Sequence, residues 1–209
     1  MWIQRDISSV LDKNKDFIQI IRGPRQCGKS SIVLRLDSSF EELSLDDPSL
    51  RELAENDPEL FLNQFKNEKI FIDEIQYAPK LFPSIKRKVD LLKREGKSPQ
   101  VLFRLTGSNQ ILMDRAVKES LAGRASYFDM NTLSVSEILN TFDIPVQEIL
   151  YRGGWPELYV YKNKEVKKYL DDYINTYIEK DIVLTAGIQK RKEFLKFIKL
   201  LAGRVGEIL

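Results

Sequence analysis

The stretch GPRQCGKS, residues 23–30, has the residue types and spacing of a phosphate-binding loop. Its glycines let the backbone wrap closely around an anion with the N–H groups pointing inward. The helix expected to start at Lys29 adds the positive end of its dipole. Lysine brings a point charge to the β- and γ-phosphates of ATP, and the serine hydroxyl is a hard oxygen ligand for Mg²⁺. The structural alternative is a glycine-rich turn with an exposed Lys-Ser pair.

This predicted Walker A loop lies between an apolar run at 17–21 and a helical pattern at 29–36. A loop between a strand and a helix is the context in which such a motif binds nucleotide. Lys29 is expected to stabilise charge during catalysis, and Ser30 is expected to bind the metal. The nucleotide-binding residues expected from the loop are Gly23, Pro24, Arg25, Gln26, Cys27, Gly28, Lys29, Ser30 and Ser31.

Two acids follow a second apolar run, in the stretch IFIDEIQ at residues 70–76. The carboxyl ends of parallel strands face the ligand crevice of an α/β sheet. Asp73 is therefore expected to reach the Mg²⁺ region, through water or second-shell contacts, as a Walker B acid does. Glu74 is expected to accept a proton from an attacking water, because the chain has no histidine to compete for that role. A solvated strand end is the alternative for both acids.

A third apolar run ends in the small polar residues of RLTGSN. Thr106, Ser108 or Asn109 could hydrogen-bond the γ-phosphate or the attacking water, which is the sensor 1 role, and Ser108 is the favoured candidate. Turn chemistry is the alternative, because serine, asparagine and glycine are common in turns.

Arg124 follows an expected helix end and precedes an expected strand at 125–130. An arginine at this place could point at a neighbouring subunit's nucleotide as an arginine finger. It could equally compensate the negative end of the preceding helix dipole. The sequence leaves both interpretations open.

The composition excludes several classes of site. The chain has 209 residues, of which 43% are apolar and 31% charged, as is usual for a globular protein. The absence of histidine excludes the usual zinc sites and the Ser-His and Cys-His nucleophile pairs. One cysteine permits no intramolecular disulfide. Hydrolytic chemistry would have to use carboxylates, lysine, arginine and a metal bound by oxygen.

No apolar run approaches the roughly 20 residues that a membrane-spanning helix needs. The N-terminus MWIQRDISSVLDK lacks the apolar region of a signal peptide. We therefore expect a cytoplasmic location and no membrane partner. The net charge of +2 says little about other partners.

Short β-rich runs alternate with helical patterns up to about residue 130, which predicts an α/β fold with a parallel sheet and helices on both faces. A single helical pattern covers 49–65, and others cover 2–13, 83–97 and 111–123. Beyond about residue 133 all further patterns are helical, including a long one at 165–187. The chain ends at VGEIL without a capping signal, which suggests a fragment.

Several motifs together resemble the AAA+ ATPases, and more narrowly a prokaryotic branch related to the STAND NTPases. They are IRGPRQCGKSS, LSLDDPSLRELAENDPELFL, IFIDEIQYAPKLFPSIKRKVD, RLTGSNQILM, ESLAGR, GGWPELY and YIEKDI. The resemblance implies a P-loop sheet of about five strands in the order 5-1-4-3-2. It further implies an ATPase core at 1–135, a helical lid at 136–190 and the start of a winged-helix domain at 191–209, often followed by a nuclease-like domain.

The resemblance also implies roles for single residues. It makes Lys29 and Ser30 the phosphate and Mg²⁺ contacts, Asp73 the Walker B acid, Glu74 the catalytic glutamate and Ser108 sensor 1. GGWPE is similar to the lid motif in which a proline, here Pro156, leans on the nucleotide. A helix break between two lid helices is the plain alternative, and both can hold. The chain departs from the family in having Ser30 where threonine is more frequent and in lacking a convincing sensor 2 arginine.

The sequence thus predicts an ATPase that hydrolyses ATP with Mg²⁺. The alternative is a slow nucleotide-dependent switch whose output is signalling or binding to DNA. The chain is expected to form a homo-oligomer and to bind DNA or a protein through the missing C-terminal region. Cys27 is interpreted as a small filler residue. A secondary hypothesis is that the loop amides and Lys29 lower its pKa and make it oxidisable.

Overall fold

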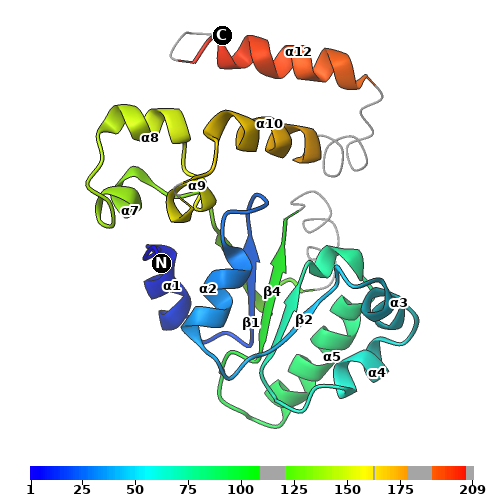
Figure 1. The fold of residues 1–209 in the computed structure, drawn as a ribbon. Coiled ribbons are helices and arrows are strands. Elements are labelled where there is room, and N and C mark those ends of the chain that lie inside the picture. Colours follow the sequence, from blue (N-terminus) through cyan, green and yellow to red (C-terminus); the bar gives the residue numbers. More distant parts are fainter. Residues whose placement is uncertain (109–120, 162, 178–189, 206–209) are drawn as a thin grey trace. The chain divides into compact units, whose positions relative to one another are not determined.

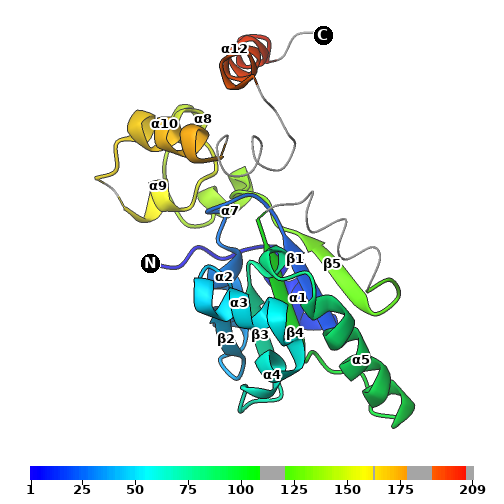
Figure 2. The ribbon, with the colours of Figure 1, turned by 90° about the vertical axis from the view of Figure 1, so that its right-hand side faces the viewer.

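A five-stranded parallel sheet forms the centre of the first of two compact units, Met1–Lys162 and Asn163–Leu209. The structure is a computed structural model that describes residues 1–108, 121–161, 163–177 and 190–205. The strands are β1 (Ile18–Arg22), β2 (Glu41–Ser44), β3 (Ile70–Asp73), β4 (Phe103–Gly107) and β5 (Ala125–Asp129). They run in the order β2-β3-β4-β1-β5, with β5 beside β1 at one edge (Figure 2). Counted from β5, this is the order 5-1-4-3-2, so the predicted P-loop NTPase fold is confirmed.

Helices cover both faces of this sheet (Figure 1). On one face lie α1 (Ile7–Lys13) and α2 (Lys29–Leu36). On the other face lie α3 (Pro48–Asn56), α4 (Pro58–Asn63) and α5 (Leu81–Arg94). A single turn of 3₁₀ helix, η1 (Ile75–Tyr77), follows β3. The sheet therefore has the two buried faces that an all-parallel sheet requires.

Alternate residues of β1 point to opposite faces, as the pleat of a strand dictates. Ile18 and Ile20 are fully buried in the cluster that contains α3, α4 and α5. Ile21 is fully buried in the cluster that contains α1 and α2. On that second face the strands also bury two polar side chains, Gln19 and Arg104, which bond to each other at 3.0 Å. Burial lowers the pKa of Arg104, and its guanidinium stays hydrogen-bonded.

The helical pattern at 49–65 corresponds to two helices, α3 and α4, and not to one. Pro58 has no N–H to donate to the preceding turn, so the first helix ends at Asn56. The carboxylate of Asp57 then accepts from the N–H of Leu60 and caps the second helix. The helix predicted over 2–13 is also shorter and begins at Ile7.

Only helices follow β5 within the described ranges. In the first unit these are α7 (Val135–Leu139), α8 (Val146–Arg152) and α9 (Glu157–Val160). The second unit contains α10 (Val166–Tyr177) and α12 (Arg191–Ala202). None of the helices in the described ranges is both long and apolar enough to cross a bilayer. The limits predicted for the lid and for the winged helix stay predictions.

Some predicted features lie outside the described residues. They are Asn109, the helix expected over 111–123 as far as residue 120, and the helix expected over 165–187 beyond Tyr177.

Candidate functional site

Four strand ends meet at one edge of the sheet, and the predicted site residues follow three of them. The last residue of β1, Arg22, is in register with Gly107 of β4 and with Asp129 of β5. Strand β3 pairs with the other side of β4 and ends at Asp73. The phosphate loop, the two acids and Ser108 therefore leave the sheet at the same edge, as predicted from the carboxyl ends of parallel strands.

Gly23 is required because the chain leaves β1 in close contact with the segment after β5. A Cβ built on Gly23 would lie 2.0 Å from the carbonyl oxygen of Met130, a distance that no side chain could tolerate. Gly28 at the N-cap of α2 has φ 98°, in the left-handed region that favours glycine. Between them, Gln26 also has a positive φ of 59°. These conformations wrap the loop around the N-terminus of α2, a place that favours anion binding in proteins.

Lys29 is 5% exposed and folds back over its own loop. Its Nζ donates to the carbonyl oxygens of Gly23 at 3.0 Å and Pro24 at 2.9 Å. An ammonium group has three donors, so two are used by the loop and one can serve a phosphate oxygen. The loop thereby fixes the position of the charge.

Hard oxygen donors from three elements meet at Asp73. Ser30 at the start of α2 donates its hydroxyl to Asp73 Oδ2 at 2.7 Å. Thr106 in β4 is fully buried and donates its hydroxyl to Oδ1, to which the N–H of Glu74 also donates at 3.1 Å. A serine hydroxyl directly against a carboxylate is an oxygen donor set that fits Mg²⁺, which usually takes only one or two protein ligands beside water and phosphate. Within the described ranges no cluster of three or more acidic or cysteine side chains offers a site of another kind.

Glu74 lies beside this cluster and is bound by a separate set of donors. It is 9% exposed and adopts φ 56°, a conformation uncommon for residues other than glycine. Its Oε2 accepts from the Oγ of Ser108 at 2.9 Å and from the N–H of Ser108 at 3.2 Å. It also accepts from Nε2 of Gln76 in η1. Such uncommon backbone conformations occur often at active sites.

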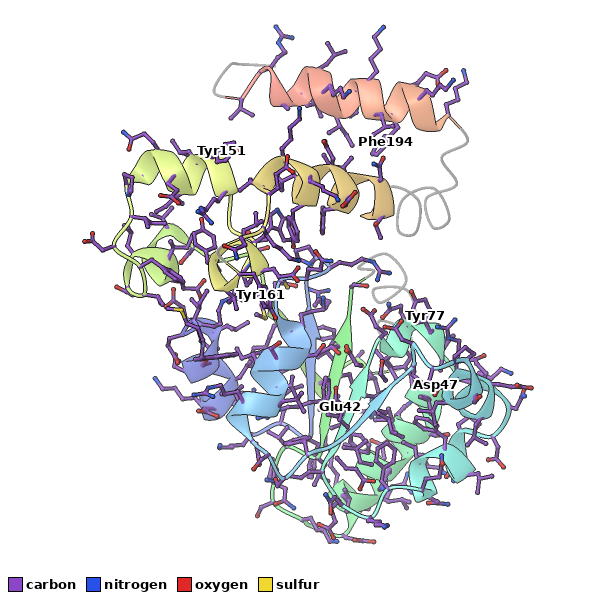
Figure 3. All side chains as sticks on the ribbon, viewed as in Figure 1. Glu42, Asp47, Tyr77, Tyr151, Tyr161 and Phe194 are labelled. Atoms are coloured by element: carbon purple, nitrogen blue, oxygen red, sulfur yellow. The ribbon has the colours of Figure 1, made fainter. Side chains whose placement is uncertain are left out.

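Arg25 and Tyr77 connect the phosphate loop to η1. Nη2 of Arg25 donates to the hydroxyl of Tyr77 at 3.3 Å. The guanidinium of Arg51 stacks on the Tyr77 ring at 4.1 Å from its centroid and donates to the carbonyl of Leu45. Tyr77 lies on the side of the first unit where the strands of the sheet end (Figure 3). The loop and the turn after Glu74 therefore support each other.

Arg124 is not brought to this site. It precedes Ala125, which is in register with Ile18, the first residue of β1, so it lies at the amino edge of the sheet. Its guanidinium donates to both oxygens of Asp90 in α5, at 2.6 and 3.1 Å. This hydrogen-bonded ion pair raises the pKa of Arg124 and lowers that of Asp90. Arg124 does not approach its own phosphate loop.

The motif GGWPE separates two helices, which is the plain alternative weighed for it. Gly153 is the C-cap of α8, and Pro156 is the N-cap of α9. A Cβ on Gly154 would lie 2.5 Å from the carbonyl oxygen of Leu133, so this glycine permits a close approach to the segment after β5. The N–H of Leu133 donates to the carbonyl of Gly154 at 2.7 Å. Contact between Pro156 and a nucleotide stays a prediction.

The structure contains a buried ion pair next to the phosphate loop that the sequence did not predict. Nε of Arg5 lies 3.0 Å from Glu137 Oε1, and both side chains are almost fully buried. Nη1 of Arg5 donates to the carbonyl of Cys27 at 2.7 Å, and Nη2 donates to the carbonyl of Asn131 at 2.7 Å. The capping box of Ser134 and Glu137 was visible as a Ser-x-x-Glu spacing. Nothing in the sequence connected it to Arg5.

The secondary hypothesis for Cys27 is wrong. The side chain is fully buried, and burial raises the pKa of the thiol despite the nearby charges of Lys29 and Arg5. Sγ lies 3.5 Å from the carbonyl oxygen of Met130. Cys27 therefore fills space between the loop and the segment after β5, as the favoured interpretation had it.

Comparison with known families decides the classification. Residues 15–139, more than half of the chain, match the AAA domain family. The chain belongs to this AAA domain family. A domain of unknown function, DUF8612, matches residues 143–209.

Two mycobacterial relatives resemble the AAA domain protein in sequence. They are the uncharacterized proteins Rv2008c of Mycobacterium tuberculosis and Mb2031c of Mycobacterium bovis. Each is 28% identical over 174 residues, covering 79% of this chain and 36% of the relative. The chain thus spans about a third of the length of these curated relatives.

A solved structure confirms the fold of the AAA domain protein. The Walker-type ATPase PABY2304 of Pyrococcus abyssi has a TM-score of 0.52 and 14% sequence identity. The match covers 94% of this chain and 78% of that one. At this identity the likeness establishes the shared P-loop fold alone.

Proposed function

We propose that this AAA domain protein binds ATP with Mg²⁺ and hydrolyses it to ADP and phosphate. The observation that carries the proposal is the arrangement at the carboxyl edge of the sheet. There Ser30 bonds Asp73, Ser108 bonds Glu74, and Lys29 is fixed over the phosphate loop. The residues proposed to bind phosphate, to bind the metal and to act as base thus lie close together on three elements.

The nucleotide would be held by the loop at residues 23–31. The amides at the start of α2 would bind the phosphate oxygens, and Lys29 would neutralise charge on the β- and γ-phosphates. Ser30 and Asp73 would hold Mg²⁺, which neutralises phosphate charge when bound. Thr106 donates its hydroxyl to Asp73 and would hold the carboxylate in place for this role.

Glu74 is proposed as the general base. A water oxygen forms a bond to the γ-phosphorus while the bond from phosphorus to the β,γ-bridging oxygen breaks, and ADP leaves with that electron pair. Glu74 accepts the proton that the water gives up. Ser108 is proposed to hold Glu74 in place through two hydrogen bonds, at 2.9 and 3.2 Å.

Replacing Lys29 with alanine is expected to weaken ATP binding at least about tenfold, because a charge-assisted bond to the phosphates is lost. Fluorescence titration with an ATP analogue, with and without Mg²⁺, measures this. Lys97→Ala is the control, since Lys97 is exposed on the loop after α5. Equal affinity in the two variants would contradict binding at this loop.

The AAA domain is further proposed to act as a homo-oligomer of the STAND-related branch, with a DNA or protein partner bound by regions outside the AAA domain. The rival function is a slow nucleotide-dependent switch that uses the same site. The two are distinguished by the rate of ATP hydrolysis with and without DNA, together with the oligomer size in ATP. A nuclease-like domain beyond the chain also stays a proposal.

Arg124→Ala is expected to leave the ATP dissociation constant within about twofold, because Arg124 lies at the opposite edge of the sheet from its own loop. If Arg124 contacts the nucleotide of a neighbouring subunit, Arg124→Ala lowers the rate of ATP hydrolysis only in the oligomer. Asp90→Ala removes the ion-pair partner but keeps Arg124, so it should keep the parental rate. Titration and steady-state rates at several protein concentrations measure both effects. A loss of affinity in the monomer would contradict this placement.

A further inference from the structure

Gln76 is a buried glutamine beside the proposed base, and neither the motifs nor the family assign it a role. It lies in η1, two residues after Glu74, and is 5% exposed. Its Nε2 donates to Oε2 of Glu74. A carboxylate can only accept hydrogen bonds, so the amide nitrogen of Gln76 must face Glu74 and the amide oxygen must face away from it.

The two oxygens of Glu74 have different surroundings. Oε2 accepts from Gln76 Nε2 and from the N–H and Oγ of Ser108. Three donors saturate the lone pairs of this one oxygen. In the described part of the chain, no hydrogen bond to Oε1 is recorded. Glu74 is therefore anchored through Oε2 and presents Oε1 as its acceptor.

No hydrogen-bond donor of the described residues reaches the amide oxygen of Gln76. Among the described residues, Oε1 of Gln76 is the single buried side-chain atom of this kind. Buried polar atoms in folded proteins nearly always have partners, and a bound water is a common partner for an atom that no described residue reaches. A water molecule has two O–H donors, and the Glu74 carboxylate needs only one of them.

We propose that Gln76 orients the attacking water in this ATPase. Its Nε2 anchors Glu74, and its Oε1 accepts one O–H of the water while Oε1 of Glu74 accepts the other. The water oxygen then bonds to the γ-phosphorus, its proton passes to Glu74 and ADP leaves with the bridging oxygen. The role rests on the proposed hydrolytic function and adds the group that fixes the direction of attack.

The competing explanation is that Gln76 only stabilises η1. The two explanations differ in which quantity changes. A water-orienting residue affects the chemical step and leaves ATP affinity unchanged, whereas a structural residue lowers stability and affinity together. Gln76→Met removes both the donor and the acceptor at nearly constant volume. Gln76→Glu keeps an acceptor oxygen but removes the donor to Glu74.

Single-turnover hydrolysis by excess protein, ATP titration and thermal unfolding test the proposal on the full 209-residue chain. Gln76→Met is expected to slow hydrolysis about 10- to 100-fold with an ATP dissociation constant within about twofold of the parent. Gln64→Met is the control, because Gln64 is an exposed glutamine at the C-cap of α4 whose amide donates to the carbonyl of Phe61. It is expected to keep the parental rate.

An unchanged rate in Gln76→Met, or losses of affinity and stability that account for the slower rate, would overturn the inference. If Gln76→Met does not fold, Gln76→Glu is measured instead, and there a parental rate would overturn it. An inactive parent chain would contradict the proposed hydrolysis itself, and this inference with it. An active parent with a fully active Gln76→Met would overturn only the role of Gln76.

Discussion

Glu74→Gln is expected to lower the rate of ATP hydrolysis at least about 100-fold while ATP affinity stays nearly the same. The amide oxygen of the new glutamine can occupy the place of Oε2 and keep the bonds from Ser108 and Gln76. The amide nitrogen then replaces Oε1, and it cannot accept a proton from water. The substitution thus removes the base and preserves its surroundings.

Phosphate release and ATP titration measure the two quantities separately. Glu95→Gln is the matched control, because Glu95 is an exposed glutamate at the C-cap of α5. It is expected to keep the parental rate and affinity. Parental turnover in Glu74→Gln would contradict the role of Glu74 as base.

Arg5→Met is expected to destabilise the fold by about 3–5 kcal/mol, because it leaves Glu137 as a buried carboxylate without its charge partner. It also removes the donor to the Cys27 carbonyl, so ATP binding should weaken as well. Urea unfolding followed by circular dichroism measures the free energy of unfolding.

Two further variants make this stability prediction specific. The N–H groups of Asp6 and Ser134 bond to different oxygens of Glu137. The double variant Arg5→Met/Glu137→Gln keeps an acceptor for one of these N–H groups and carries no unpaired charge, so it should recover part of the loss. The same change at an exposed pair, Arg87→Met beside Glu59, should cost less than about 1 kcal/mol. If Arg5→Met costs no more than Arg87→Met, the buried pair is not a structural link.

Strands β1, β3 and β4 could be predicted from the sequence because each contains a short apolar run followed by residues with a recognisable chemistry, whereas the order of the strands came from the resemblance to the AAA+ ATPases. The phosphate loop fixed the start of α2 at Lys29, and the acids marked the end of β3 at Asp73. The candidate site was thus predicted from local features. The interruption between α3 and α4 at Asp57-Pro58 also depends on local residues, because an aspartate before a proline is a common start of a helix.

The supporting contacts could not be predicted, because they join residues far apart in the chain. Arg5 and Glu137 are 132 positions apart. The role proposed for Gln76 depends on the left-handed conformation of Glu74, and a glutamate in the sequence does not predict that conformation. Thr106 was one of three candidates for the sensor 1 role, with Ser108 favoured, and its bond to Asp73 follows only from the position of β4 beside β3.

Single-turnover hydrolysis of γ-labelled ATP by an excess of the parent chain and of Glu74→Gln tests the central claim most directly. The excess of protein detects even a slow ATPase, because every ATP is bound once. The account predicts that the parent releases labelled phosphate and that Glu74→Gln retains bound, intact ATP. Release at equal rates by both proteins, or by neither, would contradict it.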